Sequence, residues 1–163
     1  MAQYTGKVWV LGDDIDTDII IPTEYLDLKT IEDMKQYGFS PQRPELAGQI
    51  KPGDIIVAGK NFGCGSSREQ APEVIKALGI PCIIAKSFAR IFYRNALNNG
   101  LLLLEQPELH DVVKEGDTIT VTVNEDVEYN GKKYPIASLP ENLMEIIEAG
   151  GLVKAMRKRN GLD

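Results

Sequence analysis

Residues 59–69 form the most informative stretch of the chain, and they read Gly59-Lys60-Asn61-Phe62-Gly63-Cys64-Gly65-Ser66-Ser67-Arg68-Glu69. An aliphatic run at residues 55–58 precedes the stretch and predicts a buried strand, and a helical pattern follows it. A glycine-rich loop between a strand and a helix lets backbone N–H groups converge on an anion. Ser66, Ser67 and Arg68 add two hydroxyls and a guanidinium that can hold a carboxylate or a phosphate. The stretch therefore indicates a small-anion site.

The same residues allow a second interpretation, in which the loop only starts a helix. Ser66 and Glu69 have the spacing of a capping box, which needs no ligand. Pro72 opposes this interpretation, because inside a helix capped at Ser66 it would remove a hydrogen bond at a cost of about 3 kcal/mol. Nucleotide-binding motifs do not match, since Arg68 stands where the dinucleotide fingerprint needs a small residue and Gly65 is not followed by Lys.

The rest of the chain predicts one mixed α/β domain over residues 1–163. We expect strands at residues 7–11, 55–58, 81–85, 101–104 and 117–123, and helices at residues 30–37, 74–78, 88–98 and 141–149. The strand–helix–strand order in the centre favours parallel pairing. Asn130-Gly131 predicts a type I′ hairpin in an antiparallel part, and Ser138 to Glu141 has the spacing of a capping box.

Composition excludes several classes of protein. The chain has 163 residues, 43% of them hydrophobic and 26% charged, which fits one domain with its own core. Its net charge of −6 makes nucleic acid and anionic membranes unlikely partners. The longest aliphatic runs, residues 19–21 and 101–104, are far shorter than the roughly 20 residues that span a bilayer. With no signal sequence at its start, we expect a cytoplasmic protein.

Metal-binding side chains are scarce. The chain has one histidine, His110, and two cysteines, Cys64 and Cys82. A zinc site needs three or four ligands and an iron–sulfur cluster needs four thiolates, so we expect neither on this chain. Both cysteines are expected to be free thiols.

Residues 61–69 also resemble the signature of the mobile C-terminal domain of the aconitase superfamily, and most closely its isopropylmalate dehydratase small subunits. Two further motifs occur in the same order, Asp16-Thr17-Asp18-Ile19-Ile20-Ile21-Pro22 and Ser87-Phe88-Ala89-Arg90-Ile91-Phe92-Tyr93. The resemblance covers residues 5–105. It implies a three-layer β/β/α swivelling domain with mixed parallel and antiparallel strands.

The resemblance also implies a function. The chain would be the small subunit of a two-subunit hydro-lyase, active only with a large subunit that carries a [4Fe–4S] cluster. The complex would isomerise a small hydroxy acid, 2-isopropylmalate, to 3-isopropylmalate in leucine biosynthesis. No metal would bind to this chain itself.

Roles for single residues follow from the same resemblance. Ser66 would be the base that removes the proton α to a carboxylate, Ser67 would hydrogen-bond substrate or hold the turn, and Arg68 would pair with a substrate carboxylate. Asp18 would help to organise the site, although it could also be an Asx-turn residue. Gln70 stands where many relatives have histidine, so no histidine role transfers to it. Arg90 and Tyr93 are expected to pack the helix or an interface rather than touch substrate.

The resemblance implies that a flexible loop within residues 23–44 selects the substrate. Leu26 and Leu28 offer an apolar wall for an isopropyl group, and Asp27 would repel a second carboxylate. Lys29 could bind that carboxylate instead, so homocitrate or dual specificity is the alternative.

Two other classes of function stay open. The loop could belong to a stand-alone module that binds a small anion or nucleotide and is stabilised by it without a partner. The chain could also be a purely structural subunit. Apolar surface reserved for a large subunit could let the isolated chain form a homo-oligomer.

Overall fold

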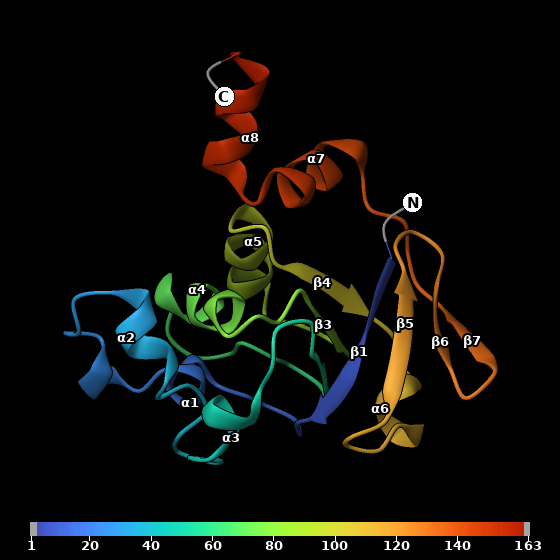
Figure 1. Ribbon diagram of the computed structural model, residues 1–163, viewed down its shortest axis with the longest axis horizontal. Helices are drawn as coiled ribbons and strands as arrows, with labels where there is room; N and C mark the ends of the chain where they lie inside the picture. The colour runs from blue at the N-terminus through green and yellow to red at the C-terminus, as the bar shows by residue number, and fades with distance from the viewer. Residues whose placement is uncertain (1–2, 162–163) are drawn as a thin grey trace.

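A curled, mixed sheet organises the computed structural model, which describes residues 3–161 (Figure 1). In this part of the chain seven strands follow the order β4-β3-β2-β1-β5-β6-β7. Their bounds are β1 Gln3–Val10, β2 Ile55–Ala58, β3 Cys82–Ala85, β4 Leu102–Glu105, β5 Thr118–Thr122, β6 Asp126–Tyr129 and β7 Lys132–Pro135. The last part of β1 pairs with β2 in parallel and its first part pairs with β5 antiparallel. β1 therefore joins a parallel half, β1 to β4, to an antiparallel half, β5 to β7.

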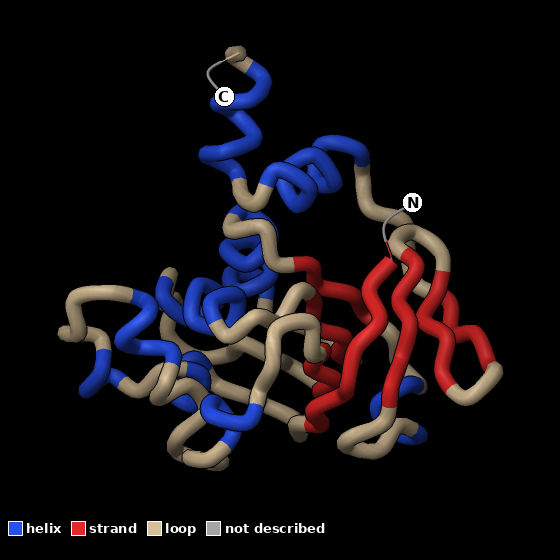
Figure 2. Tube along the Cα trace, viewed as in Figure 1, coloured by secondary structure: helices blue, strands red, loops and turns tan. Residues whose placement is uncertain are grey.

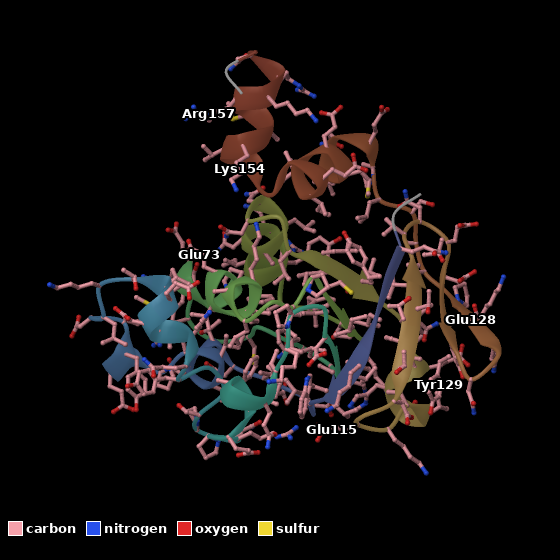
Figure 3. All side chains as sticks on the ribbon, in the orientation of Figure 1. Glu73, Glu115, Glu128, Tyr129, Lys154 and Arg157 are labelled. Atoms are coloured by element: carbon pink, nitrogen blue, oxygen red, sulfur yellow. The ribbon has the colours of Figure 1, made fainter. Side chains whose placement is uncertain are left out.

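Helices α1 to α5 cover one side of the parallel strands, and β5 to β7 lie on the other side together with α6 (Figure 1). The helices are α1 Thr17–Ile20, η1 Thr23–Tyr25, α2 Ile31–Lys35, α3 Leu46–Gln49, α4 Gln70–Ala77, α5 Arg90–Asn98, α6 Leu109–Val112, α7 Glu141–Ala149 and α8 Leu152–Arg159. Figure 2 shows α8 projecting from the body beyond α7, and Figure 3 shows Lys154 and Arg157 on it. Within residues 3–161, every helix is too short or too polar to cross a bilayer.

The alternation of side chains along the parallel strands explains the layers. Neighbouring strand residues point to opposite faces, so each strand feeds two hydrophobic clusters. One cluster joins the strands to α4 and α5 and includes Trp9, Ile56, Ile83, Val74 and Phe92. The other joins the same strands to the antiparallel half and includes Val8, Ile55, Ile84, Ile119 and Val127. The result is a β layer, a second β layer and an α layer, which confirms the expected mixed α/β fold.

Local expectations in the antiparallel half are mostly confirmed. Asn130 and Gly131 have φ of 54° and 81°, as a type I′ turn requires, and Gly150 ends α7 at φ 90°. The capping box at Ser138 is wrong. Pro140 takes the N-cap position of α7, and Ser138 Oγ instead donates to the Asn124 carbonyl at 3.2 Å.

The helix expected at residues 88–98 starts two residues later than predicted. It begins at Arg90, and the side chains it buries are those of Phe92, Ala96 and Leu97. Ile91, the neighbour of the buried Phe92, points away from the core and is 56% exposed. Residues 88 and 89 are not helical, and Phe88 forms a β-bridge with Phe62, so the helix begins only at Arg90.

Candidate functional site

The glycine-rich loop connects β2 to α4, and its serines do not cap the helix. α4 begins at Gln70, after Glu69, which makes no side-chain capping bond. Pro72 is then the third residue of the helix, where a backbone N–H has no intrahelical partner and its loss costs little. The capping-box interpretation of Ser66 is therefore wrong. Ser66 lies in the loop and is exposed.

The loop meets the start of α5 because β2 and β3 are adjacent parallel strands. Loops that leave the carboxyl ends of such strands emerge at one edge of the sheet. A short bridge joins them: the Phe62 N–H donates to the Ser87 carbonyl at 3.1 Å, and the Ala89 N–H donates to the Phe62 carbonyl at 3.0 Å. The two loops are thus fixed to one another.

A hollow of about 220 Å³ lies between these two loops. Its walls come from the glycine-rich loop, from the first turn of α5 and from α1, through Thr17, Gly63, Gly65, Ser66, Ser67, Arg68, Ala89, Arg90, Ile91, Phe92 and Asn95. The first amide groups of a helix lack intrahelical acceptors and carry partial positive charge. The walls thus bring two arginines, Arg68 and Arg90, together with the first turn of α5. Ser66, Ser67 and Arg68 all line this hollow.

Residues 15–17 hold the loop in place. The Gly63 N–H donates to the Ile15 carbonyl at 2.8 Å, and the Thr17 N–H donates to the Cys64 carbonyl at 2.9 Å. Thr17 Oγ1 donates to the Ser66 carbonyl at 2.7 Å. Gly65 has φ 92°, and a Cβ at this position would fall on the carboxylate of Asp16. The loop is therefore held by bonds to a distant segment and by a close approach that only glycine allows.

Arg68 turns towards the segment that follows α1. Its Nη1 donates to the Ile21 carbonyl at 2.9 Å, its Nη2 donates to Thr23 Oγ1 at 2.7 Å, and it forms an ion pair with Asp18. The guanidinium side chain is 13% exposed, whereas that of Asp18 is 58% exposed. The structure thus pairs Asp18 with Arg68, although Asp18 is not among the residues that line the hollow in the described part of the chain. The Asx turn is made by Asp16, whose Oδ1 accepts from the Asp18 N–H at 2.7 Å, so the alternative interpretation of Asp18 is wrong.

The expected specificity residues lie apart from the hollow. Leu26 and Leu28 are half-buried and pack against the cluster shared with α4 and α5. Lys29 is exposed. These three side chains are not among the lining residues of the 220 Å³ hollow in the described part of the chain.

An ion pair near the end of residues 23–44 could not be predicted from the sequence. Arg43 forms a two-pronged pair with Glu115, at 2.6 Å from Nη1 to Oε1 and 3.0 Å from Nη2 to Oε2. Glu115 Oε1 also accepts from the Val10 N–H at 3.1 Å, and its carboxylate lies beside the start of β5 (Figure 3). The bond from Arg43 is the main cause that lowers the pKa of Glu115 below its usual value. Neither partner belongs to a recognisable motif.

Several lining residues were not assigned to the site from sequence. Arg90 is exposed and lines both this hollow and a neighbouring hollow of about 290 Å³ beside Glu105. Thr17 and Asn95 line the first hollow. Thr17 and Arg90 lie inside the motifs at residues 16–22 and 87–93, and those motifs could have indicated them. Asn95 lies two residues after the second motif.

The chain's own residues do not fit an iron–sulfur cluster. Cys82 is fully buried, and burial raises its pKa to about 12. Cys64 is half-buried and its pKa is also raised, first by burial and then by Asp16 and Asp14. His110 Nε2 is bonded to the Leu11 carbonyl at 2.8 Å. Among residues 3–161, no three His, Cys, Asp or Glu side chains gather as a metal site would require.

Comparison with known proteins gives a consistent picture. The aconitase C-terminal domain family matches residues 17–109. A 3-isopropylmalate dehydratase small subunit from Lachnospira eligens is 79% identical over 161 residues, which cover 99% of this chain and 98% of the relative. An isopropylmalate/citramalate isomerase small subunit from Methanocaldococcus jannaschii is 47% identical, with 94% of each chain covered. The crystal structure of 3-isopropylmalate dehydratase from that organism superposes with a TM-score of 0.92 at 40% identity, over 99% of this chain and 97% of the other.

Proposed function

This chain belongs to the family of 3-isopropylmalate dehydratase small subunits, in the aconitase superfamily, and we propose that it serves the isomerisation of 2-isopropylmalate to 3-isopropylmalate in leucine biosynthesis. The observation that carries the proposal is the exposed Ser66 beside Arg68 in a hollow at the edge of the parallel strands. The two free cysteines fit a reducing compartment such as the cytoplasm.

A large subunit completes the reaction centre in this proposal. The hollow lies at the surface beside Ile91, which is 56% exposed, and an exposed apolar side chain at a polar site favours a partner that covers it. The reaction needs a Lewis acid to accept the leaving hydroxyl, and a [4Fe–4S] cluster on the large subunit would supply that chemistry.

Ser66 acts as the base. As an alkoxide, its Oγ takes the proton from the carbon next to a carboxylate, so an O–H bond forms as the C–H bond breaks. The electron pair of that bond forms the double bond, and hydroxide leaves towards the partner. A serine alkoxide needs stabilisation, which Arg68, the first N–H groups of α5 and exclusion of water by the partner provide.

Ser67 and Arg68 hold a carboxylate of the substrate. The pair between Arg68 and the mostly exposed Asp18 supports this role, because a substrate carboxylate can replace that partner without moving a buried group. Asp18 then keeps the guanidinium oriented until substrate arrives.

Leu26, Leu28 and Lys29 select the substrate from a flexible segment, residues 23–44. The segment starts at Thr23, whose hydroxyl Arg68 already holds, so it lies close enough to move over the site. Leu26 and Leu28 suit the isopropyl group, and Lys29 leaves homocitrate as a second substrate. Comparing kcat/KM for the two acids on the reconstituted complex measures this choice.

The decisive experiment uses the chain with and without a cluster-bearing large subunit of the family. We expect the purified chain to be inactive alone and to gain dehydratase activity in the complex. Ser66→Ala should lower kcat by at least about 100-fold, as the loss of a single transition-state group does. Ser138→Ala, which removes an exposed hydroxyl in the antiparallel half, is the control and should leave kcat unchanged.

Two results would contradict the proposal. Near-normal turnover of the Ser66→Ala complex would remove Ser66 as the base. A thermal shift of the isolated chain with phosphate or a nucleotide, together with no activity in the complex, would favour a stand-alone binding module.

A further inference from the structure

We propose that Thr17 is a positioning residue for the reaction, and that its buried hydroxyl fixes the backbone from which Ser66 points into the hollow. The inference rests on the proposed role of Ser66 as the base. Thr17 acts by fixing the position of Ser66 and does not contact the substrate.

Thr17 holds the loop on both sides of Gly65. Its backbone N–H donates to the Cys64 carbonyl at 2.9 Å, and its Oγ1 donates to the Ser66 carbonyl at 2.7 Å. Thr17 itself is 2% exposed, so both bonds are made by a fixed, buried residue. One residue thus holds the carbonyl groups of Cys64 and Ser66, the residues on either side of the glycine.

The start of α1 explains why Thr17 is free to make these bonds. Asp16 is the N-cap, and its side chain accepts from the Asp18 N–H. Thr17 is therefore the first helical residue, whose N–H has no acceptor within the helix. Its β-branched side chain has few rotamers, which keeps Oγ1 in one direction.

The Ser66 turn depends on such external support. Gly65 has a φ of 92°, whereas residues of regular strands and helices have negative φ. Ser66 and Ser67, which follow it, are exposed. A serine side chain has one rotatable bond between backbone and oxygen, so the position of Oγ follows the backbone closely. A misplacement of about 1 Å in a reacting group costs about 100-fold in rate. Loss of the Thr17 hydroxyl should therefore affect turnover more than folding.

The test uses the reconstituted complex and the nearly isosteric variant Thr17→Val. We expect kcat to fall by about 10- to 100-fold with KM changed less than threefold. Thr17→Ser, which keeps the hydroxyl, should restore most of the rate. Thr120→Val removes a hydroxyl that pairs with Thr5 at 3.0 Å in the antiparallel half, and it should leave kcat unchanged.

A double-mutant cycle separates positioning from other roles. If Thr17 acts through Ser66, Thr17→Val should have almost no further effect on kcat in a Ser66→Ala background. An equal loss in both backgrounds would overturn the inference, as would a loss confined to KM, which would indicate direct contact with substrate. Thr17→Ala, which adds no methyl group to the buried site, replaces the valine variant if that variant does not assemble.

Failure of the inference and failure of the proposed function give different results. Unchanged kcat in Thr17→Val, with a large loss in Ser66→Ala, overturns the positioning role alone. Unchanged kcat in Ser66→Ala overturns the base and the positioning role with it.

Discussion

Two loops of this molecule use the same residue types and are stabilised in different ways. The site loop contains Asn61 at φ 59° and Gly63 at φ 86°, and the hairpin turn contains Asn130 at φ 54° and Gly131 at φ 81°. The hairpin turn is closed by its own strands, β6 and β7, which pair directly on either side of it. The site loop joins a strand to a helix and is held by residues 15–23.

The difference shows how an exposed loop can be held in one conformation by distant residues. A two-residue turn needs only local chemistry, because its twist matches that of the flanking strands. An eleven-residue loop cannot be fixed by its own residues, and ordering each one costs about 1–2 kcal/mol of backbone entropy. Bonds from α1 and from the segment after it offset part of that cost. The position of Ser66 therefore depends on residues about 50 positions away in the chain.

Gly65→Ala should have a larger effect on turnover than any change in the hairpin turn, and it would sharpen this comparison. A left-handed alanine costs about 1–2 kcal/mol, and here its Cβ would also fall on the Asp16 carboxylate. We expect at least a 10-fold loss of kcat in the reconstituted complex, because the bonds from Thr17 on either side of Gly65 would shift. Steady-state kinetics measures the loss, and retained kcat would show that the loop tolerates movement.

Glu115→Gln should affect stability rather than rate. Because the pKa of Glu115 is lowered in the folded state, its pair with Arg43 stabilises the fold above the usual carboxyl pKa. That contribution is lost as pH falls through the lowered pKa. The pair is partly exposed, so we expect a loss of at most about 1 kcal/mol near neutral pH, which shrinks with salt and vanishes in acid.

Urea unfolding as a function of pH checks this prediction. Glu128→Gln changes an exposed carboxylate on β6 (Figure 3) and should change the unfolding free energy less. A difference between wild type and Glu115→Gln that grows towards acid pH would contradict the sign of the pKa shift.

Gly131→Ala should give the smallest effect on function. Its φ of 81° is also left-handed, but a Cβ there has no atom within 4 Å. We expect a loss of about 1–2 kcal/mol in stability, seen as a lower Tm, and unchanged kcat. A loss of activity equal to that of Gly65→Ala would break the distinction between a local turn and a loop held from a distance.

Much of the fold could be predicted from sequence because its signals are local. The aliphatic runs at β2, β3 and β4 predict buried strands, and Asn130-Gly131 predicts the hairpin. Predictions failed where a side chain had two available partners. Ser138 bonds to the Asn124 carbonyl rather than capping α7.

In the candidate site, too, local features could be predicted from the sequence and contacts between distant residues could not. Its motif residues Ser66, Ser67 and Arg68 were identifiable, because their glycine-rich context is contiguous in the chain. The hydrogen bond between Thr17 and Ser66 and the ion pair between Arg43 and Glu115 could not be predicted. Their partners lie 49 and 72 positions apart, and no local pattern indicates that they meet. The positions of Leu26 and Leu28 also depend on packing against the core rather than on their spacing.

The sequence by itself determined the strands, the parallel order of the central half, the hairpin and the chemical identity of the loop. Each of these depends on the properties of neighbouring residues. Only the tertiary structure decided that Ser66 faces a hollow shared with α5, that Arg68 already holds Asp18 and Thr23, and that α4 starts after the serines. Hydrogen bonds and close contacts between distant segments set these features, and the sheet fixes those distances by bringing β2 and β3 side by side.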